Sequence, residues 1–465
     1  MISGPLTGTI DEEEIRSHLD TAEPDPVHIR EILTRGRELR GLDSSEVALL
    51  AGVQDKALLE ELFDAARTVK NNIYGRRIVL FAPLYVSNIC RNECLYCGFR
   101  AGNRELVRKK LSLQEIADEV KILTAKGHKR LLLVAGENDS STELKYITDA
   151  IETIYKTRSG KGEIRRVNVN IASLSIEQFR ELKKTGIGTY QIFQETYHRQ
   201  TYKSMHLSGK KADYDWRLGA PARAMQAGID DVGIGPLFGL YDWKFELLAL
   251  MQHIRSLEKE FGVGPHTISV PRLEPASGSA LSKDPPYKVS DVDFMKIVAI
   301  LRLAVPYTGI IMSTRESPEM RNASLALGVS QISAGSCTNP GGYSHCETGK
   351  ADPQFSLSDH RELDEVIADI SQMGYIPSFC TGCYRLGRTG NDFMDLARPG
   401  DIRMHCDPNA VSTFQEYLED FASENTRAIG MKAIDMFCES MEPKARERAL
   451  KMAATVRAGK RDVYC

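Results

Sequence analysis

The strongest constraint on the fold is a regular alternation of apolar and amphipathic segments between residues 76 and 345. Eight short apolar segments predict strands: Ile78–Val86, Arg130–Val134, Arg166–Ile171, Gly188–Phe193, Asp231–Pro236, His266–Val270, Gly309–Ser313 and Ser330–Ala334. The amphipathic segments between them predict helices, several of which begin at Ser or Asp and end near Gly: Ser112–Ala125, Ser141–Tyr155, Ser175–Thr185, Ala220–Ala227, Asp242–Phe261, Ser290–Leu303 and Ser317–Leu327. Eight such units predict an α/β fold with a full (βα)8 barrel of the TIM type, with an open doubly wound sheet as the alternative.

The segments on either side of the barrel lack this alternation. Residues 1–75 are charged and helical in pattern, with a break at Pro24 and Pro26 and a cap for the helix of Val47 at Ser44-Ser45-Glu46. We therefore predict an N-terminal helical extension at 1–75, the barrel at 76–345 and a mainly helical C-terminal domain at 346–465.

Composition indicates which partners and which cellular compartment to expect. The 465 residues are 42% hydrophobic and carry a net charge of −3, which gives no reason to expect nucleic acid or an anionic membrane as partner. Apolar runs such as Leu131–Ala135 are too short to cross a bilayer, and the N-terminus has no basic-then-apolar signal. We therefore predict a cytoplasmic protein, in which the 10 cysteines serve as metal or redox ligands rather than in disulfides.

Three of these cysteines form a closely spaced triplet directly after the first predicted strand. Cys90, Cys94 and Cys97 follow a C-x3-C-x2-C spacing, with Tyr96 before the third. Thiolates are the ligands of a [4Fe–4S] cluster, and three of them would leave one iron open to a cofactor or substrate. A zinc knuckle or three unrelated thiols are the alternatives, but a structural zinc needs a fourth ligand and no second C-x2-C or His pair follows nearby.

A second triplet follows the barrel. Cys380, Cys383 and Cys406 are spaced C-x2-C-x22-C, and His405 adjoins the last of them. The C-x2-C pair is also typical of half a zinc site, yet three ligands with one open position favour a second iron–sulfur cluster. The helical pattern around Cys438 predicts a core position. We assign no role to the remaining cysteines, which are Cys337, Cys346 and Cys465.

Polar residues at the ends of the predicted strands mark the catalytic face of such a barrel. Arg315 and Ser313 end the seventh strand, and Ser336 follows the eighth. An arginine at this position can bind a carboxylate through two hydrogen bonds, so we predict a small substrate with an α-carboxylate, such as an amino acid. The alternative is that Arg315 only pairs with Glu316 or with an acid of a loop.

His266 stands at the beginning of the sixth predicted strand, on the opposite face of the barrel. A histidine there is most often a structural hydrogen-bonding residue, because this face of a barrel usually serves stability. If the second cysteine triplet docks under the barrel, His266 would instead face its open iron and bind a further metal ion.

The spacing C-x3-C-x-aromatic-C resembles that of radical S-adenosylmethionine (AdoMet) enzymes, whose open iron binds the methionine end of AdoMet. The resemblance implies that Gly136 and Glu137 correspond to a Gly-Gly-Glu segment that binds the AdoMet amino group, with Ala135 in place of the first glycine. It also places Tyr96 beside the cluster. Other polar strand ends would hold the ribose and the methionine head, among them Asn168, Asn170 and Glu195; capping or solvated positions are the alternative.

The full barrel combined with both triplets resembles one family within this group, the tyrosine lyases of [FeFe]-hydrogenase maturation (the HydG family). The related 2-iminoacetate synthases share the barrel and the tyrosine chemistry but lack the second triplet. The resemblance implies that Cys90, Cys94 and Cys97 hold the AdoMet cluster and that an external one-electron donor reduces it. A 5′-deoxyadenosyl radical would then cleave the Cα–Cβ bond of L-tyrosine to p-cresol and dehydroglycine.

The same resemblance implies a role for the second triplet. Cys380, Cys383 and Cys406 would hold an auxiliary cluster, and His266 would bind an additional labile iron. Dehydroglycine would reach this cluster through the barrel and become carbon monoxide and cyanide for the hydrogenase active site, with other maturation proteins as partners.

Two alternatives remain at this point. A 2-iminoacetate synthase-type or other aromatic amino-acid lyase would use only the first cluster. A non-catalytic iron–sulfur scaffold or carrier would need neither Glu137 nor Arg315, because it binds no amino acid.

Overall fold

The centre of the molecule is a closed barrel of eight parallel strands. The computed structural model describes residues 10–138, 142–344, 353–397 and 401–465. Neighbouring strands pair in chain order and the last strand pairs back on the first, which confirms the predicted barrel. The strands are β1 (Arg77–Ser87), β2 (Arg130–Ala135), β5 (Arg166–Asn170), β6 (Tyr190–Gln191), β7 (Val232–Ile234), β8 (Thr267–Ser269), β9 (Gly309–Met312) and β10 (Gln331–Ser333).

Helices surround this barrel where the sequence predicts them. Their bounds are α5 (Leu113–Ala125), α6 (Glu143–Lys156), α7 (Ile176–Lys183), α10 (Ala220–Gln226), α11 (Trp243–Phe261), α13 (Asp291–Ala304) and α14 (Pro318–Leu327). Side chains at Ser112 and Ser175 cap α5 and α7 in reciprocal capping boxes. The structure adds short elements that the sequence pattern did not reveal: the hairpin β3 (Arg158–Ser159) and β4 (Gly162–Glu163), and the helices α8 (Arg199–Met205), η1 (Lys210–Ala212), α9 (Tyr214–Leu218) and α12 (Ala280–Lys283).

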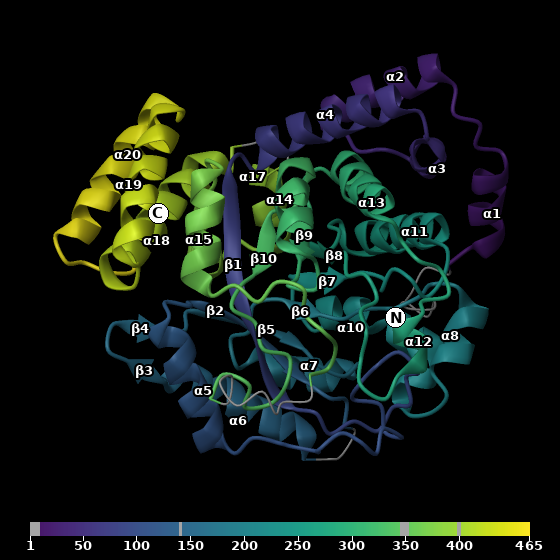
Figure 1. Cartoon of the computed structure of the whole chain (residues 1–465), viewed down its shortest axis with the longest axis horizontal. Coiled ribbons are helices and arrows are strands. Elements are labelled where there is room, and N and C mark those ends of the chain that lie inside the picture. Colours follow the sequence, from purple (N-terminus) through teal and green to yellow (C-terminus); the bar gives the residue numbers. More distant parts are fainter. Residues whose placement is uncertain (1–9, 139–141, 345–352, 398–400) are drawn as a thin grey trace.

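The N-terminal segment forms four helices packed on the barrel. They are α1 (Glu12–Asp20), α2 (Pro26–Arg37), α3 (Ser44–Gly52) and α4 (Lys56–Ile73), and α4 lies against α13 and α14 (Figure 1). The predicted cap of α3 is displaced by one residue, because Asp43 rather than Ser44 accepts the Glu46 N–H. Lys296 of α13 fastens this segment by donating to the carbonyls of Ala51 and Val53 at 2.9 and 2.7 Å.

The C-terminal segment is mainly helical and joins the same sheet. Its elements are α15 (Leu363–Gln372), β11 (Ile376–Ser378), α16 (Gly382–Arg385), α17 (Gly390–Ala397), α18 (Arg403–Asp420), α19 (Glu424–Glu439) and α20 (Pro443–Arg457). Strand β11 pairs in parallel with Arg77–Val79 at the beginning of β1 and forms a ninth strand that was not predicted. The C-terminal segment is therefore attached at the amino-terminal end of the barrel, where Figure 1 shows α18, α19 and α20 grouped beside it.

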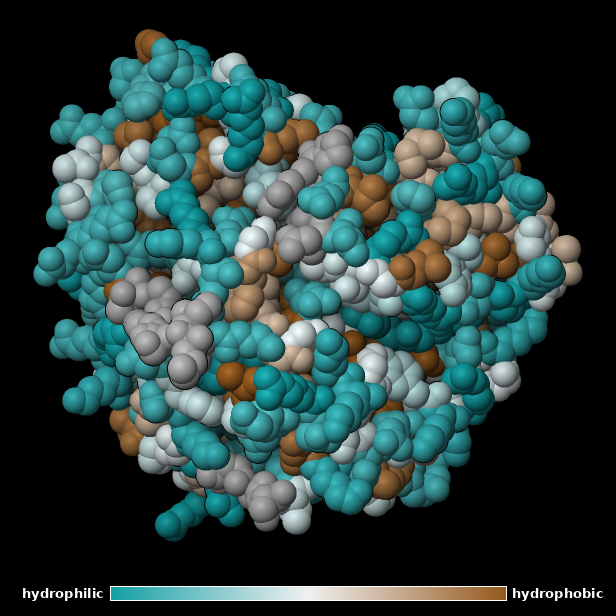
Figure 2. All heavy atoms as spheres, turned by 180° about the vertical axis from the view of Figure 1, so that it is seen from behind, coloured by the Kyte–Doolittle hydropathy of each residue, from teal (hydrophilic) through white to brown (hydrophobic). Residues whose placement is uncertain are grey.

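The surface is largely hydrophilic on the face drawn in Figure 2, where a notch at the upper edge lies between the N-terminal and the C-terminal helices. Among the described residues, no helix combines the length and apolar character needed to cross a membrane. Cys438 is buried in α19, as predicted. Cys346 lies outside the described residues.

Candidate functional site

A cavity at the carboxyl ends of the strands brings together most of the predicted site residues; we call it the upper cavity. Its cavity volume is about 180 Å³. Its lining includes Cys90, Cys94, Tyr96, Cys97, Gly136, Glu137, Asn170, Glu195, Ser313 and Arg315. Ser336 is not part of the lining, although Ser333 and Thr338 are, and the Ser336 hydroxyl is buried without a hydrogen-bond partner among the described residues. Asn168 also lies outside the lining and accepts the Thr189 N–H instead.

The cysteine loop from residue 88 to residue 99 is irregular and is fixed by hydrogen bonds to its backbone. The Arg108 guanidinium donates to the carbonyls of Asn88 and Phe99, both at 2.8 Å. On its other side the loop pairs with the chain after α8, and Cys94 and His206 form an antiparallel bridge. The three thiols are therefore held in place by the protein itself, which suits ligands of a preformed cluster site.

Gly136 is required where the second strand ends beside the cysteine loop. A Cβ atom at this position would lie 2.6 Å from the Ile89 carbonyl oxygen, closer than side chains approach backbone. The Gly136 N–H donates to the Ser87 carbonyl at 2.8 Å and sets this close approach. The close contact is made at Gly136, so Ala135 is compatible with the site.

Two carboxylates in the upper cavity are paired with two buried cations. Arg217 donates to Glu137 at 2.5 Å, and Lys211 donates to Glu195 at 2.5 Å. Burial alone would raise the pKa of Glu137, but Arg217 and Lys211 outweigh it and lower that pKa. These balanced charges suit a ligand with both an ammonium and a carboxylate group. Sequence reasoning missed Lys211 and Arg217, because the loop between α8 and α10 has no pattern that assigns them to the barrel.

A strained turn aims Glu195 into the cavity. Its φ is +72°, a left-handed conformation that non-glycine residues rarely adopt. Directly after it, the Thr196 hydroxyl and the Tyr197 N–H both donate to the carboxyl group of Glu246 on α11. Glu246 is fully buried, which raises its pKa to about 8. Helix α11 thus holds the turn through a carboxyl group that is mostly protonated at neutral pH.

Tyr96 has a fixed orientation beside the thiols. Nδ1 of His206 lies 2.8 Å from the Tyr202 carbonyl, so Nδ1 carries the proton and Nε2 accepts from the Tyr96 hydroxyl, also at 2.8 Å. Burial lowers the pKa of His206 well below its ordinary value, which keeps the imidazole neutral. The Tyr96 ring therefore serves as a rigid wall of the cavity.

Arg315 is a half-buried cation that lines the cavity. Its guanidinium stacks on the Phe355 ring with 3.2 Å between Cζ and the ring centroid. The alternative that Arg315 pairs with Glu316 is wrong. The Glu316 carboxylate accepts hydrogen bonds from Arg272 instead, from Nε at 3.0 Å and from Nη2. Within the described part of the chain Arg315 forms no ion pair, and burial lowers its pKa. It is available to an anionic group of a ligand.

A second cavity lies at the amino-terminal end of the barrel; we call it the lower cavity. Its cavity volume is about 90 Å³. Cys380, Cys383, Cys406 and His266 all line it, so the structure places His266 beside the second triplet. His405 does not line it.

The thiols of both cavities accept hydrogen bonds from nearby N–H groups. The Phe99 N–H lies 3.4 Å from Sγ of Cys97, and the Gly382 N–H lies 3.3 Å from Sγ of Cys380. Such N–H···S contacts are typical of iron–sulfur ligands, whose reduction potential they tune. In the described residues, no three His, Cys, Asp or Glu side chains converge on a single ion position.

Arginines give the lower cavity an excess of positive charge. Arg77 pairs with Asp407 at 2.7 Å. Arg130 donates to the Cys380 carbonyl at 2.7 Å, and the Arg166 guanidinium lies 3.2 Å from the centroid of the Tyr384 ring. Neither of these two buried arginines forms an ion pair with a described residue. Buried cations without carboxylates suit an anionic group, as an iron–sulfur cluster with three thiolates would be.

His266 has a protein group at each ring nitrogen. The Tyr384 hydroxyl lies 3.3 Å from Nε2, and an Asp231 carboxylate oxygen lies 3.6 Å from Nδ1. Burial lowers the pKa of His266, which favours the neutral ring that binds metal ions. Metal binding through Nε2 would require Tyr384 to move away, while Asp231 would orient the ring.

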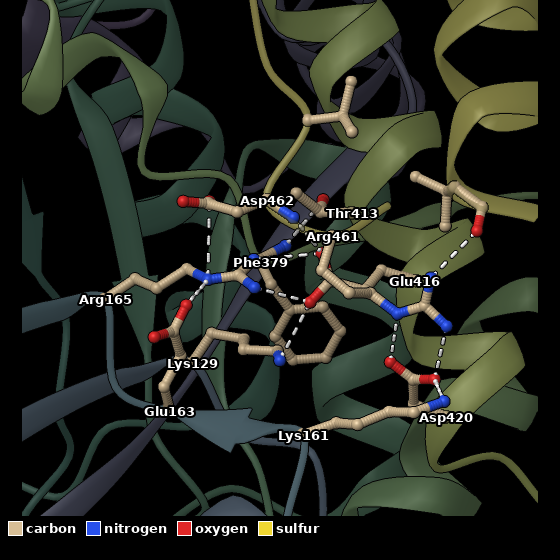
Figure 3. Close-up of polar contacts among 12 residues, drawn as sticks. Lys129, Lys161, Glu163, Arg165, Phe379, Thr413, Glu416, Asp420, Arg461 and Asp462 are labelled. Atoms are coloured by element: carbon tan, nitrogen blue, oxygen red, sulfur yellow. Dashed lines mark hydrogen bonds and ion pairs between the residues drawn. The ribbon is translucent and has the colours of Figure 1, made fainter. Parts of the chain in front are cut away.

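A buried ionic network fastens helix α18, which carries Cys406, to the barrel (Figure 3). Glu416 of α18 accepts from Arg165 at 2.6 Å and from Lys129 at 2.9 Å. Burial alone would raise the pKa of Glu416, but these two cations lower it to about 2. One turn further, Asp420 pairs with Arg461. The network fixes the helix that brings Cys406 under the barrel.

Comparison with known proteins agrees with this geometry. Residues 84–251 match the model of the Radical SAM superfamily, and residues 269–376 match the Biotin and Thiamin Synthesis associated domain. The 2-iminoacetate synthase of Salmonella typhimurium is 34% identical over 322 residues, which are 69% of this chain and 82% of that protein.

Two solved structures agree over nearly the whole chain. A crystal structure of HydG, described as a maturase of the [FeFe]-hydrogenase, shares 50% identity with a TM-score of 0.94 and covers 98% of this chain and 99% of that one. The FeFe-hydrogenase maturase HydG from Carboxydothermus hydrogenoformans shares 42% identity with a TM-score of 0.84, over 96% of this chain and 97% of that one.

The barrel and its cysteine loop define a radical SAM enzyme. The two HydG structures match this chain from end to end, including the segment with the second triplet, and so identify the family within this class. The chain belongs to the HydG family.

Proposed function

We propose that this chain is a radical AdoMet carbon–carbon lyase that cleaves L-tyrosine and produces carbon monoxide and cyanide for the active site of an [FeFe]-hydrogenase. The observation that supports this most directly is the position of the two cysteine triplets. One lines a cavity at the carboxyl ends of the strands, and the other shares a cavity with His266 at the opposite end. The 2-iminoacetate synthase-type lyase, which uses one cluster, gives no role to the second cavity.

In the upper cavity, Cys90, Cys94 and Cys97 would hold the [4Fe–4S] cluster, which with bound AdoMet supplies a 5′-deoxyadenosyl radical. Glu137 would accept from the amino group of AdoMet, and Lys211 would lie near its carboxylate. Asn170 and Glu195 would contact the ribose and the methionine head. The apolar walls of the cavity, among them Phe81, Leu132, Phe193 and Ile311, would exclude water from the reacting atoms.

The substrate would lie against the strands on the far side of the same cavity. Arg315 would bind the carboxylate of L-tyrosine, and the Ser313 hydroxyl lies on the same strand end. Loss of a hydrogen atom from the amino group would then lead to homolysis of the Cα–Cβ bond into dehydroglycine and a 4-hydroxybenzyl radical, which would take up one electron from the external donor and one proton to give p-cresol. Ser336, outside the lining, would act only if its loop rearranged.

In the lower cavity, Cys380, Cys383 and Cys406 would hold an auxiliary iron–sulfur cluster, with His266 as ligand of an additional iron, at which dehydroglycine is converted to carbon monoxide and cyanide. Arg130 and Arg166 would offset the negative charge there. Dehydroglycine would pass through the barrel, where the polar side chains of Gln191 and Gln331 line the upper and the lower cavity respectively. Such a route would shield the reactive imine from water.

The substrate is tested by product analysis of anaerobically reconstituted protein. With AdoMet, dithionite and L-tyrosine we expect both 5′-deoxyadenosine and p-cresol. An iron–sulfur carrier would give no 5′-deoxyadenosine, and formation of that product without p-cresol would remove tyrosine from the proposal. L-Tryptophan in place of L-tyrosine serves as the matched control.

A further inference from the structure

Basic residues are concentrated on the outer side of the cysteine loop. The two segments that contact this loop, residues 100–110 and 199–211, contain nine basic residues and one acidic residue, Glu105, although the whole chain has a net charge of −3. The basic residues are Arg100, Arg104, Arg108, Lys109, Lys110, Arg199, Lys203, Lys210 and Lys211. The asymmetry gives this side of the molecule a local positive charge.

Several of these cations have structural partners, and three do not. Arg100 pairs with Glu93, Arg199 with Asp215, Lys110 with Glu143 and Lys109 with Glu115. The Arg108 guanidinium donates hydrogen bonds to backbone carbonyls of the loop, and Lys211 lines the upper cavity. By contrast, Arg104, Lys203 and Lys210 are exposed and form no ion pair with a described residue. Their charges are therefore available to a partner.

The backbone contacts show that these three cations border one surface. Glu93 lies between two strips of chain, because its carboxylate accepts the Gly102 N–H at 2.6 Å while its own N–H donates to the Ser208 carbonyl at 3.1 Å. Arg104 follows the first contact by two residues, and Lys210 follows the second by two. The side chain of Leu207, 56% exposed, adds an apolar group between Lys203 and Lys210.

This surface lies directly over the ligands of the upper cluster. The Leu207 N–H donates to the Glu93 carbonyl at 2.9 Å, and Glu93 adjoins Cys94. A protein bound there would approach the cluster through a layer of backbone about one residue thick.

We propose that Arg104, Lys203, Leu207 and Lys210 form the docking surface for a small acidic one-electron carrier protein; the proposal rests on the cluster assigned to Cys90, Cys94 and Cys97. The reduced carrier loses one electron and the cluster gains it, with no bond formed or broken. Charge complementarity around an apolar contact favours rapid, salt-sensitive association of this kind.

The test compares two triple variants with matched loss of charge. In the first, Arg104→Gln, Lys203→Gln and Lys210→Gln neutralise the docking surface. In the control, Lys432→Gln, Lys444→Gln and Lys451→Gln neutralise exposed lysines of α19 and α20, which Figure 1 shows far from α8. The probe is oxidised flavodoxin, an acidic one-electron carrier, titrated calorimetrically at low and at high salt.

We expect the docking variant to bind flavodoxin about 10-fold or more weakly than wild type at low salt, and the control to bind as wild type. High salt should remove most of the difference. Equal binding by wild type and the docking variant, or an equal loss in the control, would overturn the proposal.

A second measurement separates docking from catalysis. With reduced flavodoxin as donor, the docking variant should form 5′-deoxyadenosine more slowly than wild type, whereas dithionite, which needs no docking, should give equal rates. A loss with both donors would place these residues in the catalytic machinery and contradict the proposal. If wild type is inactive even with dithionite, the proposed function fails, and the binding titration still decides whether the surface exists.

Discussion

The two cavities of the barrel differ in how their charges are balanced. In the upper cavity, Glu137 and Glu195 are paired with Arg217 and Lys211, so that these four groups neutralise one another before any ligand binds, and Arg315 is left for the carboxylate of the substrate. Arg130 lines the lower cavity and Arg166 stacks on Tyr384 in its wall; both are buried and form no ion pair with a described residue. Burying an unpaired cation is costly, so its neutralising partner is expected from the ligand.

The difference indicates that the two ends of the barrel serve different ligands. Paired carboxylates and cations suit the ammonium and carboxylate of AdoMet, because each ligand group can replace one member of an existing ion pair. An excess of cations suits a permanently bound anionic cluster. The upper site is also made of barrel residues and its adjoining loops, whereas the lower thiols belong to a C-terminal segment that must be fastened to the barrel.

The largest effect is expected from removal of an upper thiol. Cys94→Ala should lower 5′-deoxyadenosine formation by about 1000-fold or more, beyond the about 10- to 100-fold cost of losing an outer contact of a metal site. Iron bound by the lower triplet should remain. Cys438→Ala, which removes a buried thiol of α19, is the control and should keep full activity. Retained activity in Cys94→Ala would exclude Cys94 as a cluster ligand.

The network at α18 provides the next test, because it concerns only the lower site. Glu416→Gln leaves Lys129 without a carboxylate, while Arg165 keeps Glu163 at 2.9 Å, and should lower the free energy of unfolding by about 3 kcal/mol. Denaturant unfolding measures this loss, and iron analysis should show weaker loading of the lower cluster. Glu419→Gln on the same helix removes a carboxylate from a more exposed pair with Arg427 and should change stability by less than about 1 kcal/mol. Equal effects of the two variants would mean that burial of the network is unimportant.

Arg315 tests the substrate side of the upper cavity. Arg315→Met removes a charged hydrogen bond worth about 1.5–3 kcal/mol, which corresponds to about 10- to 150-fold in kcat/KM for L-tyrosine. AdoMet affinity should stay unchanged, and Arg315→Lys should recover part of the loss. Unchanged kinetics for L-tyrosine in Arg315→Met would remove the carboxylate contact from the account.

The narrowest test concerns the turn at Glu195. Since the pKa of Glu246 is raised from 4.5 to about 8, the folded protein holds a proton there that the unfolded chain releases above pH 4.5. Stability from this group is therefore complete below that pH and is lost as the pH rises toward 8, by at most about 1.4 kcal/mol per pH unit. Glu246→Gln should flatten this dependence in denaturant unfolding at several pH values. An unchanged slope would contradict the assignment of the proton to Glu246.

Sequence pattern predicted the barrel because each βα unit repeats the same signals of apolar run, cap and glycine. It also placed His266 at the lower end, because all parallel strands of a barrel begin at that end. Strand β11 escaped prediction because three residues, Ile376–Ser378, with a proline among them carry no strand signal. Arg217 escaped because its partner Glu137 is 80 residues away in the chain, and Lys211 escaped because only tertiary folding brings it to Glu195 at the end of another strand. Ser336 was misplaced because side-chain direction beyond the end of β10 no longer follows strand alternation.

The central claim is that the two cavities perform separate steps of one reaction sequence. Its most direct test is the product balance of Cys380→Ala/Cys383→Ala beside wild type, with AdoMet, dithionite and L-tyrosine. The account predicts that the variant still forms p-cresol while carbon monoxide and cyanide are lost or strongly reduced. Undiminished carbon monoxide in the variant, or none from wild type that does form p-cresol, would contradict it.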